Sequence, residues 1–409
     1  MKLWIDHAHQ SSPGDDPRPS RTAVSTLRSE DQFVAVVVSG QGSGITDQEL
    51  GVTGHESRVT SGLAQRATAN LASGVSMDAA VDDVLAALPV GEHVAIALLR
   101  VARDGRASLA EIDAPPLFMA RRGNFVLLPV TEEERAGRLV RRCDFAVQDG
   151  DHLAMVGEGT IRARGGVRPW SWRDVAVSIR RLTATGCDAE QLAGALVRLA
   201  GSWKLEAGER QVADSKSANQ QISKSTIRNP QSAMVVLALF VRPMRTATVW
   251  SGPPARREMD GAALAQLMTE EGTRIICGDT TAEIAARLLG AELVMEPPPA
   301  EGWTEVPPVS RLAGSAERID LITEGVVTLG VARERLAQAK CSRDLAGRED
   351  GASRLAKLLL EADKINFVVG AAINPAQTER DGTPLRKAAV ERLAERLTAR
   401  GKIVAVEHF

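Results

Sequence analysis

The sequence predicts an α+β fold in two domains, with antiparallel β layers covered by helices first and a parallel three-layer α/β domain second. The chain of 409 residues exceeds the roughly 250 to 300 residues at which a single hydrophobic core stops growing. Up to about residue 242, tight turns connect apolar strands, whereas from about residue 245 strands and helices alternate, which is typical of a parallel sheet. We therefore expect domains at residues 1–242 and 245–409.

The first domain is organised around residues 33–44, FVAVVVSGQGSG. Six consecutive apolar residues, four of them valine, cannot bury only one face by alternation, so this strand is expected to be covered on both sides. It ends in Gly40, Gly42 and Gly44, which allow another group to approach the backbone closely. The glycines alone fit a ligand site and a plain strand-to-helix turn equally well.

The other elements of the first domain follow from apolar spacing and turn signals. Apolar residues recur at helical spacing between residues 46 and 88 with a break near Gly74, which predicts two helices. Asp104-Gly105 predicts a hairpin, and Ser171 and Asp188 begin two further helices. The polar residues 206–232 predict a mobile loop or insertion. Strands are expected at residues 3–5, 22–27, 92–101, 107–112, 117–120, 125–128, 151–156 and 233–241.

The second domain alternates strands with helices. Apolar β-branched runs predict strands at residues 246–250, 274–277, 319–322, 365–369 and 402–406. Helices are expected between them and after them, at residues 260–270, 281–289, 326–339, 353–361 and 384–399.

Composition excludes several classes of protein. The chain carries 50 basic and 52 acidic residues without a long block of either sign, so we expect no nucleic-acid partner. Its four cysteines are far apart, which excludes a disulfide framework and a zinc site. Without a signal peptide or an apolar run of about 20 residues, we expect a cytoplasmic protein that has no membrane partner. A protein or a small molecule is the expected partner.

Residues 151–160, DHLAMVGEGT, repeat the pattern of an apolar strand that runs into glycine. Together with residues 33–44 they resemble the metal-dependent (PPM-type) serine/threonine phosphatases of the stage II sporulation E branch. In that family the first core strand ends V-x-x-S-D-G-x-G-S-G and a later strand ends V-x-S-D-G. The resemblance implies two Mg²⁺ or Mn²⁺ ions that activate a water for attack on phosphoserine or phosphothreonine.

The metal ligands that the resemblance implies are largely replaced in this chain. Ser39 stands where the family has the first aspartate, and Gly40 is retained. Glu158-Gly159 replaces the second Asp-Gly and keeps a carboxylate, so Glu158 is the candidate catalytic and metal-ligating residue, with Gly40 and Gly159 beside it. The family's upstream Gly-Asp falls near Thr22, and its late G-D-D-x-T falls at residues 229–232, which carry no acid. Residues that could supply a missing carboxylate are Asp15, Asp16, Asp31 and Asp47.

The second domain has a candidate ligand site of its own. Ligands of parallel α/β sheets bind outside the carboxyl ends of the strands, and these ends carry glycine and hydroxyl residues that could hold an anion or a polar ligand. The alternative is that Asp279 and Thr280 only cap a helix. The candidate residues are Gly278, Asp279, Thr280, Thr281, Thr323, Glu324 and Asn374.

This half resembles the C-terminal domain of the stage II sporulation E-type phosphatases encoded beside bacterial iron hydrogenases. The matching segments are SGPP at residues 251–254, ICGDTTA at 276–282, DLITEGVVTL at 320–329, DGAS at 350–353 and AINPA at 372–376. With the first-domain motifs, the resemblance covers nearly the whole chain except residues 206–232.

Two functions are therefore expected, and the sequence does not decide between them. The first is a phosphatase-like regulatory protein that hydrolyses phosphoserine or phosphothreonine on a partner if a metal site survives. The second is a degenerate pseudophosphatase, a sensor or scaffold that binds a phosphoprotein or a small ligand without a metal. An enzymatic second domain is a third, weaker option, because no nucleophile and base pair is visible there.

Overall fold

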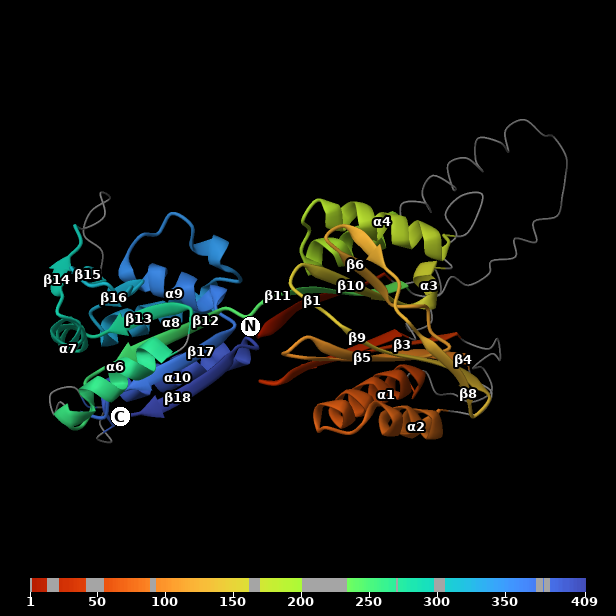
Figure 1. The fold of residues 1–409 in the computed structure, drawn as a ribbon, viewed down its shortest axis with the longest axis horizontal. Coiled ribbons are helices and arrows are strands. Elements are labelled where there is room, and N and C mark those ends of the chain that lie inside the picture. Colours follow the sequence, from red (N-terminus) through yellow and green to blue (C-terminus); the bar gives the residue numbers. More distant parts are fainter. Residues whose placement is uncertain are drawn as a thin grey trace, which may run out of the picture. The chain divides into compact units, whose positions relative to one another are not determined.

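The computed structural model describes residues 2–12, 22–41, 55–88, 93–161, 170–200, 234–269, 271–297, 306–372, 378 and 383–409. The chain divides into two compact units, Met1–Pro243 and Met244–Phe409, drawn as ribbons in Figure 1. The polar insertion expected at residues 206–232 lies outside the described residues. In the described ranges no helix is both long and apolar enough to cross a membrane.

The first unit contains two antiparallel sheets. The six-stranded sheet has the order β2-β3-β4-β5-β9-β8, and the five-stranded sheet has the order β1-β11-β10-β6-β7. The strands are β1 (Leu3–Ser12), β2 (Thr22–Arg28), β3 (Gln32–Gln41), β4 (His93–Ala102), β5 (Arg106–Ile112), β6 (Phe118–Arg121), β7 (Asn124–Val126), β8 (Thr131–Arg135), β9 (Arg138–Ala146), β10 (Asp151–Val156) and β11 (Met234–Pro243).

The two sheets pack face to face, and helices cover their outer faces (Figure 1). In β3, Phe33 and Val37 face the other sheet, while Val34 and Val38 face α1 (His55–Ala72) and α2 (Met77–Ala87). The apolar run is thus buried on both faces, as predicted. Helix α4 (Trp172–Ala184) and helical residues 189–200 cover the five-stranded sheet. The expected antiparallel β layers covered by helices are confirmed.

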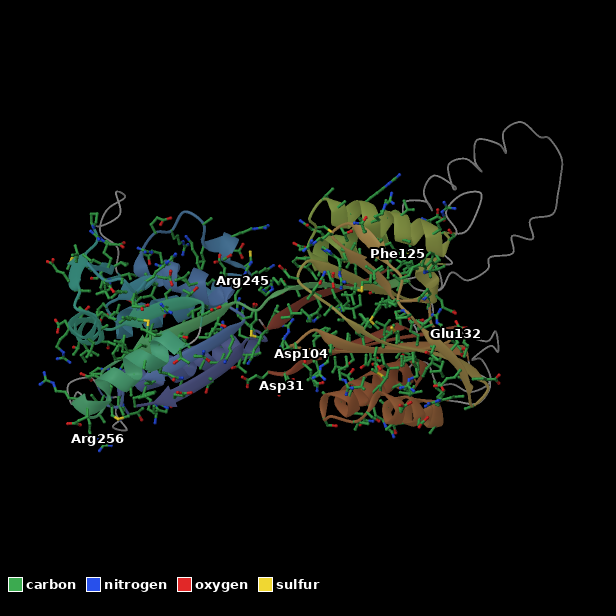
Figure 2. The ribbon with its side chains drawn as sticks, viewed as in Figure 1. Asp31, Asp104, Phe125, Glu132, Arg245 and Arg256 are labelled. Atoms are coloured by element: carbon green, nitrogen blue, oxygen red, sulfur yellow. The ribbon has the colours of Figure 1, made fainter. Side chains whose placement is uncertain are left out.

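The sequence at the start of α4 determines where this helix begins and which side of it packs on the sheet. Ser171 caps it by accepting a hydrogen bond from the N–H of Asp174, and the Asp174 carboxylate accepts one from the N–H of Ser171. Phe125 of β7, labelled in Figure 2, packs edge-on against Trp172 with 5.3 Å between the ring centroids. The cap fixes where α4 begins, and the aromatic contact fixes its face on the sheet.

Sequence analysis missed the hairpin formed by β8 and β9. Its sequences, TEEER and RLVRRCDFA, are too charged to predict strands from apolar alternation. Charge is common in a strand at the edge of a sheet, where β8 lies, because it discourages pairing with other chains. Arg135 and Arg142 both pair with Asp78 at the start of α2, so the charges of this hairpin bind the helix beneath it.

The second unit is built on one seven-stranded sheet with the order β14-β15-β16-β13-β12-β17-β18. It is a mixed sheet and not the wholly parallel one expected, because β14 and β15 are antiparallel at one edge. The antiparallel hairpin lies in a segment where no strand was predicted. Its strands are β12 (Thr246–Ser251), β13 (Thr273–Cys277), β14 (Glu292–Met295), β15 (Ser310–Ala313), β16 (Leu321–Thr323), β17 (Lys364–Val369) and β18 (Ile403–His408).

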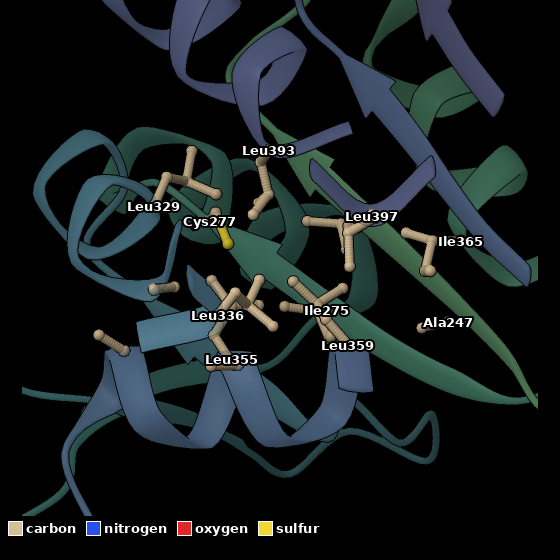
Figure 3. Close-up of a cluster of buried hydrophobic side chains, with 14 of the residues drawn as sticks. Ala247, Ile275, Cys277, Leu329, Leu336, Leu355, Leu359, Ile365, Leu393 and Leu397 are labelled. Atoms are coloured by element: carbon tan, nitrogen blue, oxygen red, sulfur yellow. The ribbon is translucent and has the colours of Figure 1, made fainter. Parts of the chain in front are cut away.

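Helices cover both faces of this sheet. Helices α6 (Asp260–Thr269) and α7 (Asp279–Leu289) share one core cluster, and three others share the cluster on the opposite face, namely α8 (Val326–Gln338), α9 (Gly351–Glu361) and α10 (Leu385–Ala399). Figure 3 shows leucines of the second set packed around Ile275 and Cys277 of β13. The carboxyl ends of β12, β13, β16 and β17 therefore lie side by side at one edge.

Candidate functional site

The two strand ends that the phosphatase-like motifs marked lie in contact. Ser39 near the end of β3 is 8% exposed and pairs in register with Thr22 of β2. Gly157 directly follows β10, and a Cβ atom built on it would lie 3.5 Å from the Cβ of Ser39 and 3.7 Å from its Oγ. One end comes from each sheet, so segments more than a hundred residues apart in the sequence form one site.

The packing of Gly157 against Val235 leaves no room for a side chain at position 157. A Cβ atom on Gly157 would lie only 2.6 Å from Cγ1 of Val235, closer than non-bonded carbons can approach. The Gly157 N–H donates to the Val235 carbonyl over 2.9 Å, and the Thr160 hydroxyl donates to the same oxygen over 3.0 Å. The chain then turns into α3 (Glu158–Ile161), which contains the candidates Glu158, partly exposed, and Gly159, buried.

The donors described at this site do not fit two divalent cations. Glu158 contributes a carboxylate and Ser39 and Thr22 contribute hydroxyls, whereas two hard cations need several anionic oxygens to offset their charge. Within the described ranges no three His, Cys, Asp or Glu residues are grouped so that they could hold a metal ion. The retained Gly40 is the last but one residue of β3 and carries no side chain to add.

One proposed substitute carboxylate is excluded by its position. Asp31 (Figure 2) precedes the first residue of β3, whereas Ser39 is near the last, roughly 25 Å away along an extended strand. Asp31 therefore cannot supply a ligand beside Ser39, and that expectation was wrong. Asp15, Asp16 and Asp47 lie outside the described residues.

Sequence analysis missed the buried carboxylate of Glu111 in the same unit. Glu111 of β5 is 1% exposed, and its Oε2 lies 3.0 Å from Nη2 of Arg141 while its Oε1 accepts from the N–H of Leu117 over 2.5 Å. Burial raises the pKa of Glu111 to about 7, although Arg141 and the Leu117 N–H act in the opposite direction. Leu117 leads from one sheet into the other, so Glu111 fixes that crossover. The signal was an acid inside an apolar strand.

In the second unit the predicted ligand residues come together at the ends of β13 and β16. The N–H of Gly278 donates to the carbonyl of Thr323 over 2.8 Å. A Cβ atom on Gly325 would lie 3.3 Å from the Cα of Gly278, and both glycines have positive φ, 133° and 147°. The starts of α7 and α8 therefore lie next to each other. Asn374 lies outside the described residues.

The charges at these helix starts disfavour an anion there. The N–H groups of Val327 and Thr328 donate to the carboxylate of Glu324, so the start of α8 already holds an anionic group. Burial and the nearby charge of Asp279 raise the pKa of Glu324, and burial followed by the charge of Glu283 raises the pKa of Asp279. Two such carboxylates favour a cation or a hydrogen-bond donor as the ligand at this position over an anion.

The hydroxyls of this edge differ in exposure. Thr280 is exposed, while Thr281 is fully buried and its Oγ1 has no hydrogen-bond partner among the described residues. Cys277 lies beside Thr323 and is fully buried, and burial raises the pKa of its thiol to about 12. A thiol with this pKa is not a nucleophile near neutral pH.

Comparison with protein-family models and with curated proteins gave no match. Among solved structures, the chain is similar to the phosphatase domain of SpoIIE from Bacillus subtilis, at 12% identity and a TM-score of 0.37, over 59% of this chain and 93% of that chain. A SpoIIE structure that includes a fragment of the regulatory domain is similar at 11% identity and a TM-score of 0.43, over 59% of this chain and 64% of that chain.

A third similar structure contains the RsbU and RsbW domains of a protein from Mycobacterium tuberculosis. It gives 16% identity and a TM-score of 0.40 over 69% of each chain. The chain is thus similar, at low sequence identity, to structures of PP2C-type phosphatase domains.

Proposed function

We propose that the first unit is a phosphatase-like regulatory module that binds a phosphorylated protein and does not hydrolyse it efficiently. The observation that carries this proposal is the contact between Ser39 and Gly157, where the family motif would bring two metal-binding aspartates together. Ser39 offers a hydroxyl instead of a carboxylate, and Glu158 beside it leaves too little negative charge to balance two dications.

A hydrolytic phosphatase is the second candidate, and Glu158 favours it. This residue follows the contacting Gly157 directly and is partly exposed, so its carboxylate could hold one Mg²⁺ or Mn²⁺ beside the backbone of Gly40 and Gly159. The substrate would then be phosphoserine or phosphothreonine on a regulatory partner.

The motifs of the second unit support placing the chain in the branch encoded beside bacterial iron hydrogenases. In that branch the second unit would act as the sensor that binds a small ligand, while the first unit recognises the phosphoprotein. Binding of a small ligand to residues 245–409 alone would support this division, and binding only to residues 1–242 would contradict it.

Hydrolysis of p-nitrophenyl phosphate with Mn²⁺ separates the two candidates. We expect the parent protein to be no faster than a Glu158→Ala variant, with Glu134→Ala on the exposed face of β8 as the matched control. A parent rate at least tenfold above that of Glu158→Ala, with Glu134→Ala equal to the parent, would establish the hydrolytic function. A Ser39→Asp variant that gains activity would locate the defect at the replaced residue.

A further inference from the structure

The sheet of the second unit reverses its strand order between β12 and β17. From β12 the chain adds β13 and then β16 on one side, and it returns to add β17 and β18 on the other. Helix α6 after β12 and helix α10 after β17 consequently cover opposite faces. In open parallel sheets a crevice for ligands forms outside the carboxyl ends of two such strands.

Two glycines bring the backbones close together at this reversal. Gly252 follows β12 with a φ of 86°, and Gly370 follows β17. A Cβ atom on Gly370 would lie 2.0 Å from the carbonyl oxygen of Pro253 and 2.2 Å from that of Gly252. A Cβ atom on Gly252 would lie 1.8 Å from Nη1 of Arg386. The guanidinium group therefore lies directly against the backbone that ends β12.

Arg386 is a partly buried cation with few partners. Its Nη2 donates to the carbonyl of Ala372 over 2.9 Å, and its buried Nε has no hydrogen-bond partner among the described residues. Burial lowers the pKa of Arg386, and within the described ranges no acidic side chain offsets this effect. A guanidinium removed from water without a carboxylate is costly, so its environment favours an added anion.

The start of α10 adds to the same positive potential. Arg386 is the second residue of the helix, and Pro384 at the cap position provides no side-chain hydrogen bond to the first turn. The first N–H groups of a helix and its dipole both favour an anion at this end. Helix α10 holds no acidic side chain in its first turn.

Ser251 supplies a hydroxyl to the same face. It is fully buried at the end of β12, and its Oγ has no hydrogen-bond partner among the described residues. Residues alternate along a strand, so Ser251 shares the face of Ala247 and Val249, which pack in one cluster with Val390 of α10. A buried hydroxyl without a partner costs free energy unless a ligand satisfies it.

We propose that Arg386, Ser251 and the first turn of α10 bind the oxyanion group of a small ligand at the reversal point. The planar fork of the guanidinium pairs with a phosphate or a carboxylate through two parallel hydrogen bonds. The first turn of α10 and the Ser251 hydroxyl provide further donors. The site lies in the second unit, where β12 and β17 end beside the ends of β13 and β16 that carry Asp279 and Glu324.

Thermal unfolding of the full chain in inorganic phosphate or acetate, at ionic strength matched with chloride, tests this site. A ligand that binds only the folded chain raises the unfolding temperature in a saturable manner. We expect phosphate or acetate to do so in the parent and in Arg396→Gln, which makes the same charge change at the exposed far end of α10. Arg386→Gln should abolish the rise. The anion that acts identifies the phosphate or carboxylate class.

Ser251→Ala keeps the test decisive if Arg386→Gln does not fold. It removes a hydroxyl that has no partner, so the unfolding temperature without anion should stay unchanged while half-saturation needs roughly tenfold more anion. If Arg386 only holds the loop of Ala372, Ser251→Ala will respond like the parent, and the proposal fails. The proposal fails equally if neither phosphate nor acetate raises the unfolding temperature of the parent above its value in chloride.

Discussion

At the scale of single residues, Glu111 makes stability depend on pH. Its folded pKa of about 7 exceeds its ordinary value of 4.5, so between these pH values only the folded chain holds the proton. The free energy of unfolding should therefore fall as pH rises from 4.5 to 7, by an amount on the order of 3 kcal/mol. Urea unfolding at several pH values should show a flatter profile for Glu111→Gln.

The exposed Glu134 on β8 provides the control for this comparison. Glu134→Gln should keep the pH profile of the parent. If Glu111→Gln also follows the parent profile, the carboxyl of Glu111 is ionised throughout this range, and the assignment of a raised pKa is wrong.

Gly157 leads to a second prediction at this scale. Gly157→Ala places a methyl group 2.6 Å from Cγ1 of Val235, and overpacking of this kind typically costs about 1 to 3 kcal/mol. Urea unfolding should show this loss, and adding Val235→Ala to the same chain should relieve part of it. Gly62→Ala in α1 meets nothing within 4 Å, so it should be neutral or slightly stabilising. Equal effects at both glycines would contradict the close packing of Gly157 against Val235.

At the scale of helices and strands, Asp350 joins α9 to α8. It accepts hydrogen bonds from the N–H groups of Ala352 and Ser353, both over 3.1 Å, and pairs with Arg335. Burial alone would raise the pKa of Asp350, but Arg335 and the N–H and hydroxyl of Ser353 hold it below its ordinary value.

Asp350→Ala removes the cap and leaves Arg335 without its carboxylate, so we expect a loss of roughly 3 kcal/mol by urea unfolding. Asp350→Asn retains the cap and should lose clearly less. Identical losses in the two variants would mean that the cap contributes nothing.

Local signals predicted some elements well and could not predict others. The six apolar residues of β3 and the cap at Ser171 identify a buried strand and a helix start without tertiary information. The charged hairpin of β8 and β9 and the hairpin of β14 and β15 are held by pairing with neighbouring strands, which overrides their weak intrinsic preference.

Among the residues of the candidate sites, too, some follow from a local sequence pattern and others do not. The motifs located Ser39 and Glu158, because glycine after an apolar strand is a local pattern. The burial of Glu111, the steric role of Gly157 and the position of Arg386 against Gly252 depend on contacts between segments distant in sequence, which no local pattern encodes.

At the scale of the whole molecule, each unit has cores of its own. Among the residues that the structure describes, each core cluster takes its members from residues 1–243 or from residues 244–409 and never from both. We therefore expect residues 244–409 to fold alone and to unfold cooperatively with temperature when followed by circular dichroism. A fragment without a cooperative transition would show that this unit depends on residues 1–243.

At the contact of Ser39 with Gly157 we expect too little negative charge to hold two divalent cations. Calorimetric titration of the intact chain with Mn²⁺ tests this expectation most directly, because the number of ions bound is independent of any choice of substrate. We predict that no pair of Mn²⁺ ions binds the chain with micromolar affinity. Uptake of two ions per chain, lost in Glu158→Ala, would contradict it and show that further carboxylates complete the site.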